Sequence, residues 1–322
     1  MWPATGMTSR LAPRTDRRPL LAYYGHHKCA STWLGDILAR IMDEIGLHQV
    51  AAFDLLAPSA IGQFRIQGEP PVPFDRSELR EQVDARGVDL VTVHGADREL
   101  AEILRPFRAF HVIRDPRDLI VSGYFSHLNS HPVEGLPHLL AHRRALQSVS
   151  PQEGLLLEME FDKTVIQQIG DWDYTDDSVL ELKMEELTLH PYDSFVQIFR
   201  HLGLLVEDEP TRARDQTRIW TTRLLNRLSK RRSLSFLRRT IPASGELVLG
   251  TVYAQRFETK ATGRVRGVED VTSHYRKGVA GDWVNHFEPR HAEAFQAHYG
   301  DVLIRLSYED DADWVRRVGL HS

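Results

Sequence analysis

The stretch from Leu20 to Ile45 is the part of the sequence that most constrains the fold. It begins with a short apolar run, Leu20 to Tyr24, which is typical of a buried strand. From Ser31 onward, apolar residues recur every three or four positions, which predicts an amphipathic helix with Ser31 as its N-cap. A buried strand joined to a helix by a short loop indicates an α/β protein, with ligand-binding loops at the carboxyl ends of parallel strands.

Between the strand and the helix lies a loop, residues 25–32, that reads Gly-His-His-Lys-Cys-Ala-Ser-Thr. Free N–H groups and the positive end of a helix dipole suit such a loop to an anion, and Lys28 adds a full charge. A nucleotide-triphosphate loop would read G-x-x-x-x-G-K-S/T, but Lys28 follows Gly25 by three residues and no second glycine precedes it. The pattern indicates either an anion other than a magnesium-bound triphosphate or an ordinary turn with a solvated lysine.

Composition narrows the class of protein. Of the 322 residues, 42% are hydrophobic and 26% charged, as in ordinary globular proteins, and the net charge of −5 gives no overall attraction to nucleic acid or anionic membranes. Cys29 is the single cysteine, which rules out an intrachain disulfide and suits a reducing compartment. No apolar run approaches the ~20 residues of a membrane span, and residues 1–18 contain arginines without the apolar core of a signal peptide. We therefore expect a cytoplasmic protein with no transmembrane segment.

Two further strands are predicted, each ending at a residue with useful chemistry. Residues 88–94 are short, apolar and β-branched, and they end at His94. Phe110 to Ile113 form the next strand, followed by Arg114 and a helix that carries Ser122 about two turns in. Taken alone, His94 is interpreted as a structural histidine held by a hydrogen bond. Arg114 is interpreted in the same way as a salt-bridged residue beside a helix.

The loop around Lys28 resembles a known motif. Its run HHKCASTW is similar to the 5′-phosphosulfate-binding loop, roughly Y-P-K-[ST]-G-[ST]-T-W, of sulfotransferases that use 3′-phosphoadenosine 5′-phosphosulfate (PAPS). Lys28, Ser31, Thr32 and Trp33 match this pattern. A histidine replaces the usual proline, and Ala30 replaces the usual glycine.

Two later stretches resemble the same family. The run RDPRDLIVSGYFS is similar to its 3′-phosphate-binding stretch, in which an arginine and a serine eight residues later hold the phosphate, as Arg114 and Ser122 would here. The run RKGVAGDWVNHF, which begins at Arg276, is similar to the family signature R-K-G-x-x-G-D-W-K-N-x-F. We interpret Asp282 and Trp283 as residues that lock this loop. Arg117 and Asp118 are interpreted as a solvated or salt-bridged pair.

The resemblance implies a role for each matching residue. His94 is implied as the general base, and Lys28 as a catalytic residue that stabilises charge on the leaving phosphate. The family's lysine shortly before the catalytic histidine is missing, since Thr92 and Val93 stand there. Trp33 is implied to pack beside the adenine. The implied cofactor-binding residues are Lys28, Cys29, Ala30, Ser31, Thr32, Trp33, Arg114, Ser122, Arg276, Lys277 and Gly278.

Three residues of the loop invite other interpretations. Cys29 could be a thiol of lowered pKa at a helix N-terminus, but a small residue that fits the turn is the simpler interpretation. His26 and His27 are adjacent, and we expect them to line the pocket or to be exposed. No metal-ligand spacing is apparent, and the implied chemistry needs no metal.

The resemblance covers most of the chain and implies an α/β fold: a single domain with a central parallel sheet flanked by helices, as in the P-loop-NTPase-like sulfotransferase fold. We expect a loose N-terminal tail over residues 1–18, the sulfotransferase domain over 19–308 and a C-terminal tail over 309–322. The implied activity is sulfuryl transfer from PAPS to a hydroxyl of a small-molecule acceptor, with an amine as the second choice. The alternatives are a non-catalytic protein that binds PAPS or 3′-phosphoadenosine 5′-phosphate (PAP), and a P-loop small-molecule kinase.

Other parts of the sequence leave their role open. Residues 211–241 are rich in arginine and leucine, which predicts an amphipathic helix with a solvated cationic face, or a gate over an anionic or lipidic acceptor. Nucleic acid is disfavoured because this stretch lacks a platform of stacking aromatic residues. The family's dimerisation pattern is not matched after Phe287, so the oligomeric state stays open, and no motif identifies the acceptor.

Overall fold

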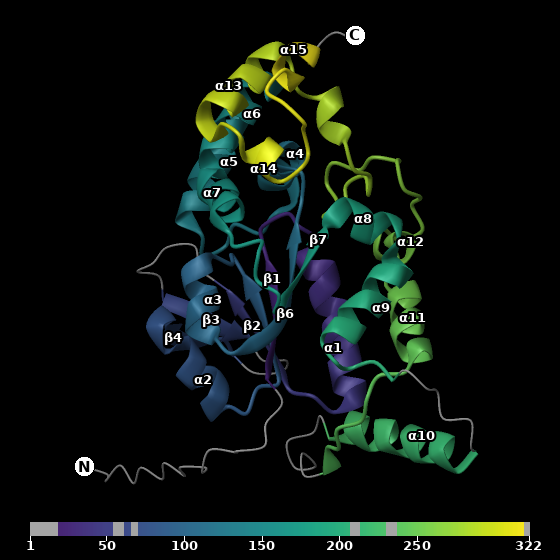
Figure 1. Ribbon diagram of the computed structural model, residues 1–322. Helices are drawn as coiled ribbons and strands as arrows, with labels where there is room; N and C mark the ends of the chain where they lie inside the picture. Colours follow the sequence, from purple (N-terminus) through teal and green to yellow (C-terminus); the bar gives the residue numbers. More distant parts are fainter. Residues whose placement is uncertain (1–18, 54–60, 66–69, 207–212, 230–236, 319–322) are drawn as a thin grey trace.

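The computed structural model describes residues 19–53, 61–65, 70–206, 213–229 and 237–318 (Figure 1). Within these ranges, seven strands form one sheet in the order β4-β3-β2-β5-β1-β6-β7. Their bounds are β1 (Leu20–Gly25), β2 (Gln49–Phe53), β3 (Ile61–Arg65), β4 (Val72–Asp75), β5 (Leu90–His94), β6 (Phe107–Ile113) and β7 (Val179–Lys183).

Strand β1 lies near the middle of the sheet and pairs in parallel with β5 and β6. Because side chains alternate along a strand, Leu21 and Tyr23 enter the core on one face, while Ala22 and Tyr24 enter it on the other. All six residues of β1 are buried, which explains its unbroken apolar run. The predicted α/β class with a central, mostly parallel sheet is confirmed.

Helices cover both faces of the sheet (Figure 1). On one face the core contains residues of α1 (Ser31–Ile45), α8 (Met184–Leu189), α9 (Pro191–His201) and α11 (Gly245–Ala254). On the other face it contains residues of α2 (Leu79–Ala85) and α3 (Arg98–Leu104). The expected apolar stripe of α1 is confirmed, since Leu34, Ile37, Leu38, Ile41 and Ile45 are all buried.

A third group of helices packs beyond the carboxyl ends of the strands, at the top of Figure 1. It consists of α4 (Pro116–Phe125), the π-helical segment η2 (Ser126–Ser130), α5 (Pro137–Gln147), α6 (Pro151–Phe161), α7 (Lys163–Asp171), α13 (Pro289–Tyr299), α14 (Val302–Arg305) and α15 (Trp314–Arg317). Part of the segment expected as a C-terminal tail is therefore helical, and its Trp314 is buried in this core.

The proline-rich segment after α1 adds strands that the sequence did not indicate. Strands β2, β3 and β4 extend one edge of the sheet, and the pairs β2–β3 and β3–β4 are antiparallel. Pro73 is accommodated because β4 is the outermost strand, where a missing N–H donor costs no ladder hydrogen bond. A short 3₁₀ helix, η1 (Arg76–Glu78), leads from β4 into α2.

The basic stretch forms helix α10 (Ala213–Leu228) against α1. Arg227 contacts Glu44 of α1, and Asn226 donates to the Glu44 carbonyl. The outer side also exposes Trp220, Leu224 and Leu228, so it is more apolar than the solvated cationic face that we expected. Residues 207–212 and 230–236 of this region lie outside the described residues, as do residues 1–18.

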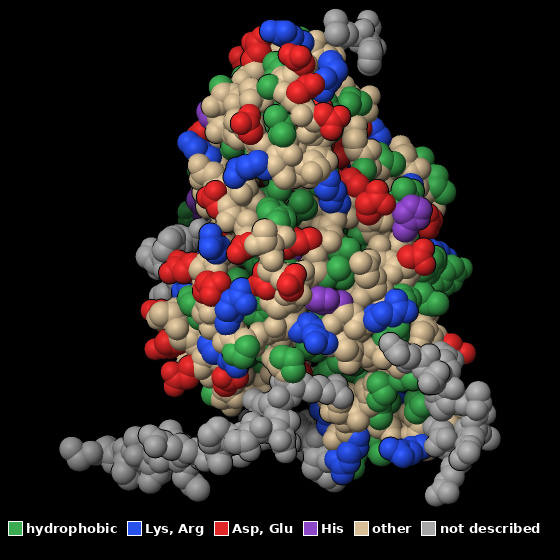
Figure 2. All heavy atoms as spheres, viewed as in Figure 1, with side chains coloured by type: hydrophobic (Ala, Val, Ile, Leu, Met, Phe, Trp, Pro, Cys, Tyr) green, Lys and Arg blue, Asp and Glu red, His purple; other side chains and the backbone are tan. Residues whose placement is uncertain are grey.

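The remaining short helices are α12 (Phe257–Lys260) and the 3₁₀ helix η4 (Asp282–Asn285). On the face shown in Figure 2, acidic and basic side chains are interspersed, in keeping with the small net charge. None of the described helices is long and apolar enough to span a bilayer.

Candidate functional site

Three neighbouring strands bring the candidate residues together at the carboxyl ends of the strands. In the register of the sheet, Gly25 at the end of β1 lies beside His94 of β5 on one side and Val112 of β6 on the other. The loop after β1 carries Lys28, and Arg114 follows the end of β6. Because the strands are parallel, their carboxyl ends meet at the same edge, which is where α/β proteins bind ligands.

The loop between β1 and α1 is held in an unusual backbone conformation. Lys28 and Ala30 have φ angles of 62° and 59°, in the left-handed region that glycine adopts most easily. Ala30 is also the N-cap of α1, without a side-chain hydrogen bond, and Ser31 is already helical. The prediction that Ser31 is the N-cap is therefore wrong. The left-handed turn at Ala30 accounts physically for the glycine that the resembling motif has at this position.

Replacing Ala30 with glycine should stabilise the protein. Holding an alanine in the left-handed conformation destabilises the folded protein by roughly 1–2 kcal/mol. Glycine removes this strain, but its more flexible unfolded chain offsets about 0.4–1 kcal/mol of the gain. We therefore expect the free energy of unfolding to rise by roughly 0.5–1 kcal/mol in Ala30→Gly. Urea denaturation measures this change, with Gly35→Ala in the middle of α1 as a control substitution in ordinary helical geometry. A lower stability of Ala30→Gly would contradict the prediction.

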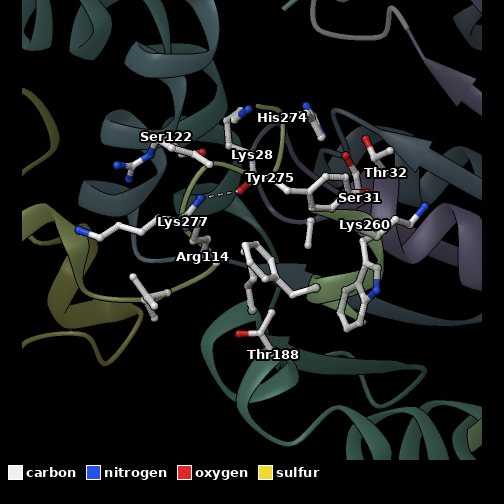
Figure 3. A pocket seen from close by; sticks show the side chains of 18 of the residues that line it. Lys28, Ser31, Thr32, Arg114, Ser122, Thr188, Lys260, His274, Tyr275 and Lys277 are labelled. Atoms are coloured by element: carbon white, nitrogen blue, oxygen red, sulfur yellow. Dashed lines mark hydrogen bonds between the residues drawn. The ribbon is translucent and has the colours of Figure 1, made fainter. Parts of the chain in front are cut away.

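A cavity of about 310 Å³ opens beside this loop (Figure 3). It receives side chains from the β1–α1 loop, the end of β6, helix α4 and residues 274–280. Most of the predicted site residues line it: Lys28, Ala30, Ser31, Thr32, Trp33, Arg114, Ser122, Arg276, Lys277 and Gly278. Cys29 and His94 do not line it.

Cys29 is fully buried beneath the loop, and burial raises the pKa of its thiol. It packs with Ile113 and Leu119 in the helical core above the sheet. The simpler interpretation, a small residue that fits the turn, agrees with this environment.

Arg114 and Lys28 are tied together at the cavity wall. The Arg114 guanidinium donates a 3.2 Å hydrogen bond to the Lys28 carbonyl and lies 4.0 Å from Asp118. Burial, followed by the positive charge of Arg114, lowers the pKa of Lys28 to about 8. Two cations held this close in a partly buried cavity favour an anionic ligand.

The loop after residue 275 is organised around one buried carboxylate. Asp282 accepts hydrogen bonds from Arg276 and Lys277, each at 2.5 Å, and also from Asn285 and His286. Burial alone would raise the pKa of Asp282, but the hydrogen bonds from His286, Lys277 and Arg276 outweigh it and hold this pKa far below its usual value. Asp282 therefore locks the loop, as expected, and both cations line the cavity with a carboxylate partner already in place.

Gly278 permits the close packing of this loop. Its φ angle is 72°, and a side-chain carbon there would collide with the ring of Phe257. A left-handed turn and a close contact both require glycine at this position.

A second carboxylate, Asp118, joins the loop to α4. Its side chain accepts hydrogen bonds from the backbone N–H groups of Gly281, at 2.6 Å, and Trp283, at 2.9 Å. Arg117 is also buried, where it pairs with Asp115 and Glu309 and lies over the Trp283 ring. The prediction of a solvated or mutually paired Arg117 and Asp118 is therefore wrong, because each is buried and has its own partners.

His94 occupies the end of β5, beside the β1–α1 loop. Its ring makes an edge contact with Tyr23. Burial, followed by the charge of Arg65, lowers the pKa of His94 to about 4. The imidazole is therefore neutral near pH 7, and its low pKa makes it a weaker base than an ordinary histidine.

Trp33 has a defined structural contact. Its indole N–H donates to the Gln255 carbonyl at 2.7 Å, which ties α1 to the end of α11. The ring lines the cavity and contacts Phe195 edge-on. Packing beside an adenine stays a prediction.

The two loop histidines differ from each other. His27 lines the cavity, as expected, but His26 is fully buried and lies 2.8 Å from His111, so its expected place in the pocket or at the surface is wrong. Two further cavity histidines, His131 and His274, were not predicted. The proximity of His274 to the loop depends on the tertiary fold, since His274 lies 246 positions after Lys28 in the sequence.

The chain was compared with known proteins. It matches no family model and no curated protein. Among solved structures it is similar to the mouse sulfotransferase SULT7A1 complexed with PAP, with a TM-score of 0.49 and 15% identity over 94% of this chain and 90% of that one. It is also similar to a retinol dehydratase in complex with androsterone and the inactive cofactor PAP, with a TM-score of 0.43 and 13% identity over 89% of this chain and 82% of that one. The function of this chain therefore has to be inferred from its own cavity.

Proposed function

We propose that this protein is a PAPS-dependent sulfotransferase that transfers a sulfuryl group to a hydroxyl of a small-molecule acceptor. One observation carries the proposal. Three stretches that resemble parts of one nucleotide site, and that are far apart in the sequence, line a single cavity through Lys28, Arg114 with Ser122, and Arg276 to Gly278. Independent resemblances that converge in space are hard to explain by chance.

The cavity suits the donor in charge. PAPS carries phosphate groups at the 3′ and 5′ positions of its ribose. When bound, it supplies the activated sulfuryl group. Lys28 and the N-terminus of α1 would hold the 5′ side, and Arg114 with Ser122 the 3′-phosphate. Lys260 and Arg266 also line the cavity and add to its positive charge.

In the proposed reaction the protein mainly positions groups and stabilises charge. His94 would accept the proton of the acceptor hydroxyl, in keeping with its neutral imidazole and its place beside the loop. Lys28 would stabilise the charge that develops on the leaving phosphate. The transfer as proposed uses no metal ion.

We also propose that residues 19–308 form the sulfotransferase domain and that the protein acts in the cytoplasm. The single cysteine, buried in the core, supports a reducing compartment. The acceptor is proposed only as a small molecule with a hydroxyl group.

The proposal is tested by incubating the purified protein with ³⁵S-labelled PAPS and a library of hydroxyl compounds. Transfer of label to at least one acceptor, with release of PAP, is expected. PAP binding without transfer to any acceptor would favour a non-catalytic PAP-binding protein. Tight magnesium-dependent ATP binding without PAP binding would favour a small-molecule kinase.

Affinity for PAP should fall as the pH rises above about 8. Lys28 has a pKa of about 8 in the free protein, and a bound phosphate would favour its charged form and so raise that pKa. Between the two pKa values, binding takes up a proton, and the affinity should fall about tenfold per pH unit. Titration calorimetry from pH 7 to 9.5 measures this, and Lys28→Met should flatten the profile. An unchanged slope in that variant would show that another group titrates.

A further inference from the structure

A cluster of histidines and carboxylates lies behind the cavity and takes no part in the proposed transfer. Three helical segments contribute to it: His127 from η2, His142 from α5 and Glu158 from α6. Glu158 is fully buried, His127 is 2% exposed, and the His142 side chain is 9% exposed. Their ligand atoms all lie within 4.8 Å of one another.

The two imidazoles contact different oxygens of the same carboxylate. His127 Nδ1 lies 2.6 Å from Glu158 Oε1, and His142 Nε2 lies 2.7 Å from Glu158 Oε2. Two imidazoles and a carboxylate from three elements form a donor set that first-row transition metals favour. Metal bonds of about 2.0–2.2 Å would require the two imidazoles to move away from the carboxylate oxygens that they now contact.

A second buried carboxylate lies beside Glu158. Asp162 is 2% exposed, and its Oδ2 atom is buried without a hydrogen-bond partner. A side-chain carbon at Gly123 would collide with both Asp162 Oδ2 and Glu158 Oε1, so these two oxygens converge beside the same backbone. Two converging carboxylate oxygens require a proton or a cation between them.

Within the described ranges, neither carboxylate has a lysine or arginine as an ion-pair partner. The ion-pair partners of Glu158 are His127 and His142, and that of Asp162 is His27, with Nδ1 at 3.8 Å. Buried carboxylates are usually paired with cations or coordinate metals. Both carboxylates raise the pKa of Lys28, but that side chain does not come within ion-pair distance of either one.

The backbone around the group has the features of a built site. His127 lies in a π-helical segment, a rare conformation that occurs often at functional sites. Gly123, one turn earlier, leaves room for the two carboxylates.

We propose that His127, His142 and Glu158 bind a divalent transition-metal ion such as Zn²⁺, with the buried Asp162 carboxylate beside them as a further negative charge. Each imidazole would present a lone pair to the ion, so binding releases protons and weakens at acidic pH. The ion would lie behind His27, whose ring stacks on His127 with centroids 5.0 Å apart and also lines the cavity. It would fix this wall of the cavity and would be separate from the transfer chemistry.

The experiment uses the full-length protein without a histidine tag, stripped with a chelator and titrated with Co²⁺ as a visible probe. We expect one equivalent to bind with the intense absorption bands of a four-coordinate site, and Zn²⁺ to displace it. His142→Ala and Glu158→Gln should each weaken the affinity by more than ~100-fold, because changes merely adjacent to metal ligands already cost ~10–100-fold. His138→Ala, from the same helix as His142 but outside the group, is the matched control and should bind as the wild type does.

The wild-type titration tests the proposal even if a variant fails to fold. Absence of the four-coordinate spectrum, or of metal in the protein as purified, would overturn it and leave a hydrogen-bonded network in its place. Equal affinity in His142→Ala, with retained circular dichroism, would also overturn it. The readout needs no PAPS, so it stands or falls independently of the proposed sulfotransferase activity.

Discussion

Replacing Arg114 with alanine should weaken PAP binding by roughly 10- to 150-fold, since a hydrogen bond to a charged group contributes about 1.5–3 kcal/mol. Arg114 lines the cavity and also donates to the Lys28 carbonyl, so the variant would lose a proposed phosphate contact and the support of the loop. Titration calorimetry measures the change. Because the proposed nucleotide site uses no metal, added Mg²⁺ should leave the wild-type affinity for PAP unaltered.

Two further variants sharpen this test. Arg114→Lys keeps the charge but loses the planar fork of the guanidinium, so its affinity should lie between those of the wild type and the alanine variant. Arg40→Ala, at an exposed position of α1, is the matched control and should have no effect. Unaltered PAP affinity in Arg114→Ala would remove this residue from the site.

Replacing His94 with alanine should lower turnover by about 10²- to 10⁴-fold, which is the usual contribution of a positioned general base. PAP affinity should stay the same, because His94 does not line the cavity that holds the proposed phosphate ligands. Single-turnover transfer of ³⁵S label to an acceptor from the library measures the rate, and calorimetry measures the affinity.

The outcome also discriminates between candidate bases. If His94→Ala retains full turnover, the base lies elsewhere, and His27 is the next residue to test because it lines the cavity beside Lys28. His27→Asn then serves as the second variant. Loss of PAP binding in His94→Ala would instead indicate that this histidine supports the loop.

Much of the fold could be predicted because the decisive signals are local. The apolar run of β1 and the apolar stripe of α1 depend only on neighbours in the sequence, and both were predicted correctly. Strands β5 and β6 were predicted for the same reason. Strands β2, β3 and β4 were not predicted. The last two form a short antiparallel edge with a proline, which carries little local signal.

The errors at the site concern contacts between distant parts of the chain. Arg117 reads as a surface residue, yet its partner Glu309 lies 192 residues away. His26 is paired with His111, at a separation of 85 residues. The sequence also did not indicate the proposed metal-binding group, because its members come from three segments. Spacing along the sequence cannot indicate which charges a fold will bury together.

The carboxylates of Asp118 and Asp282 have a consequence for kinetics. Between them they fix the backbone and both cations of the loop from Arg276 to Trp283 without any contribution from a ligand. A nucleotide that enters such a rigid cradle has little conformational entropy left to remove. Ligands that differ in how well they fill the cavity should then arrive at similar rates and differ chiefly in how long they stay.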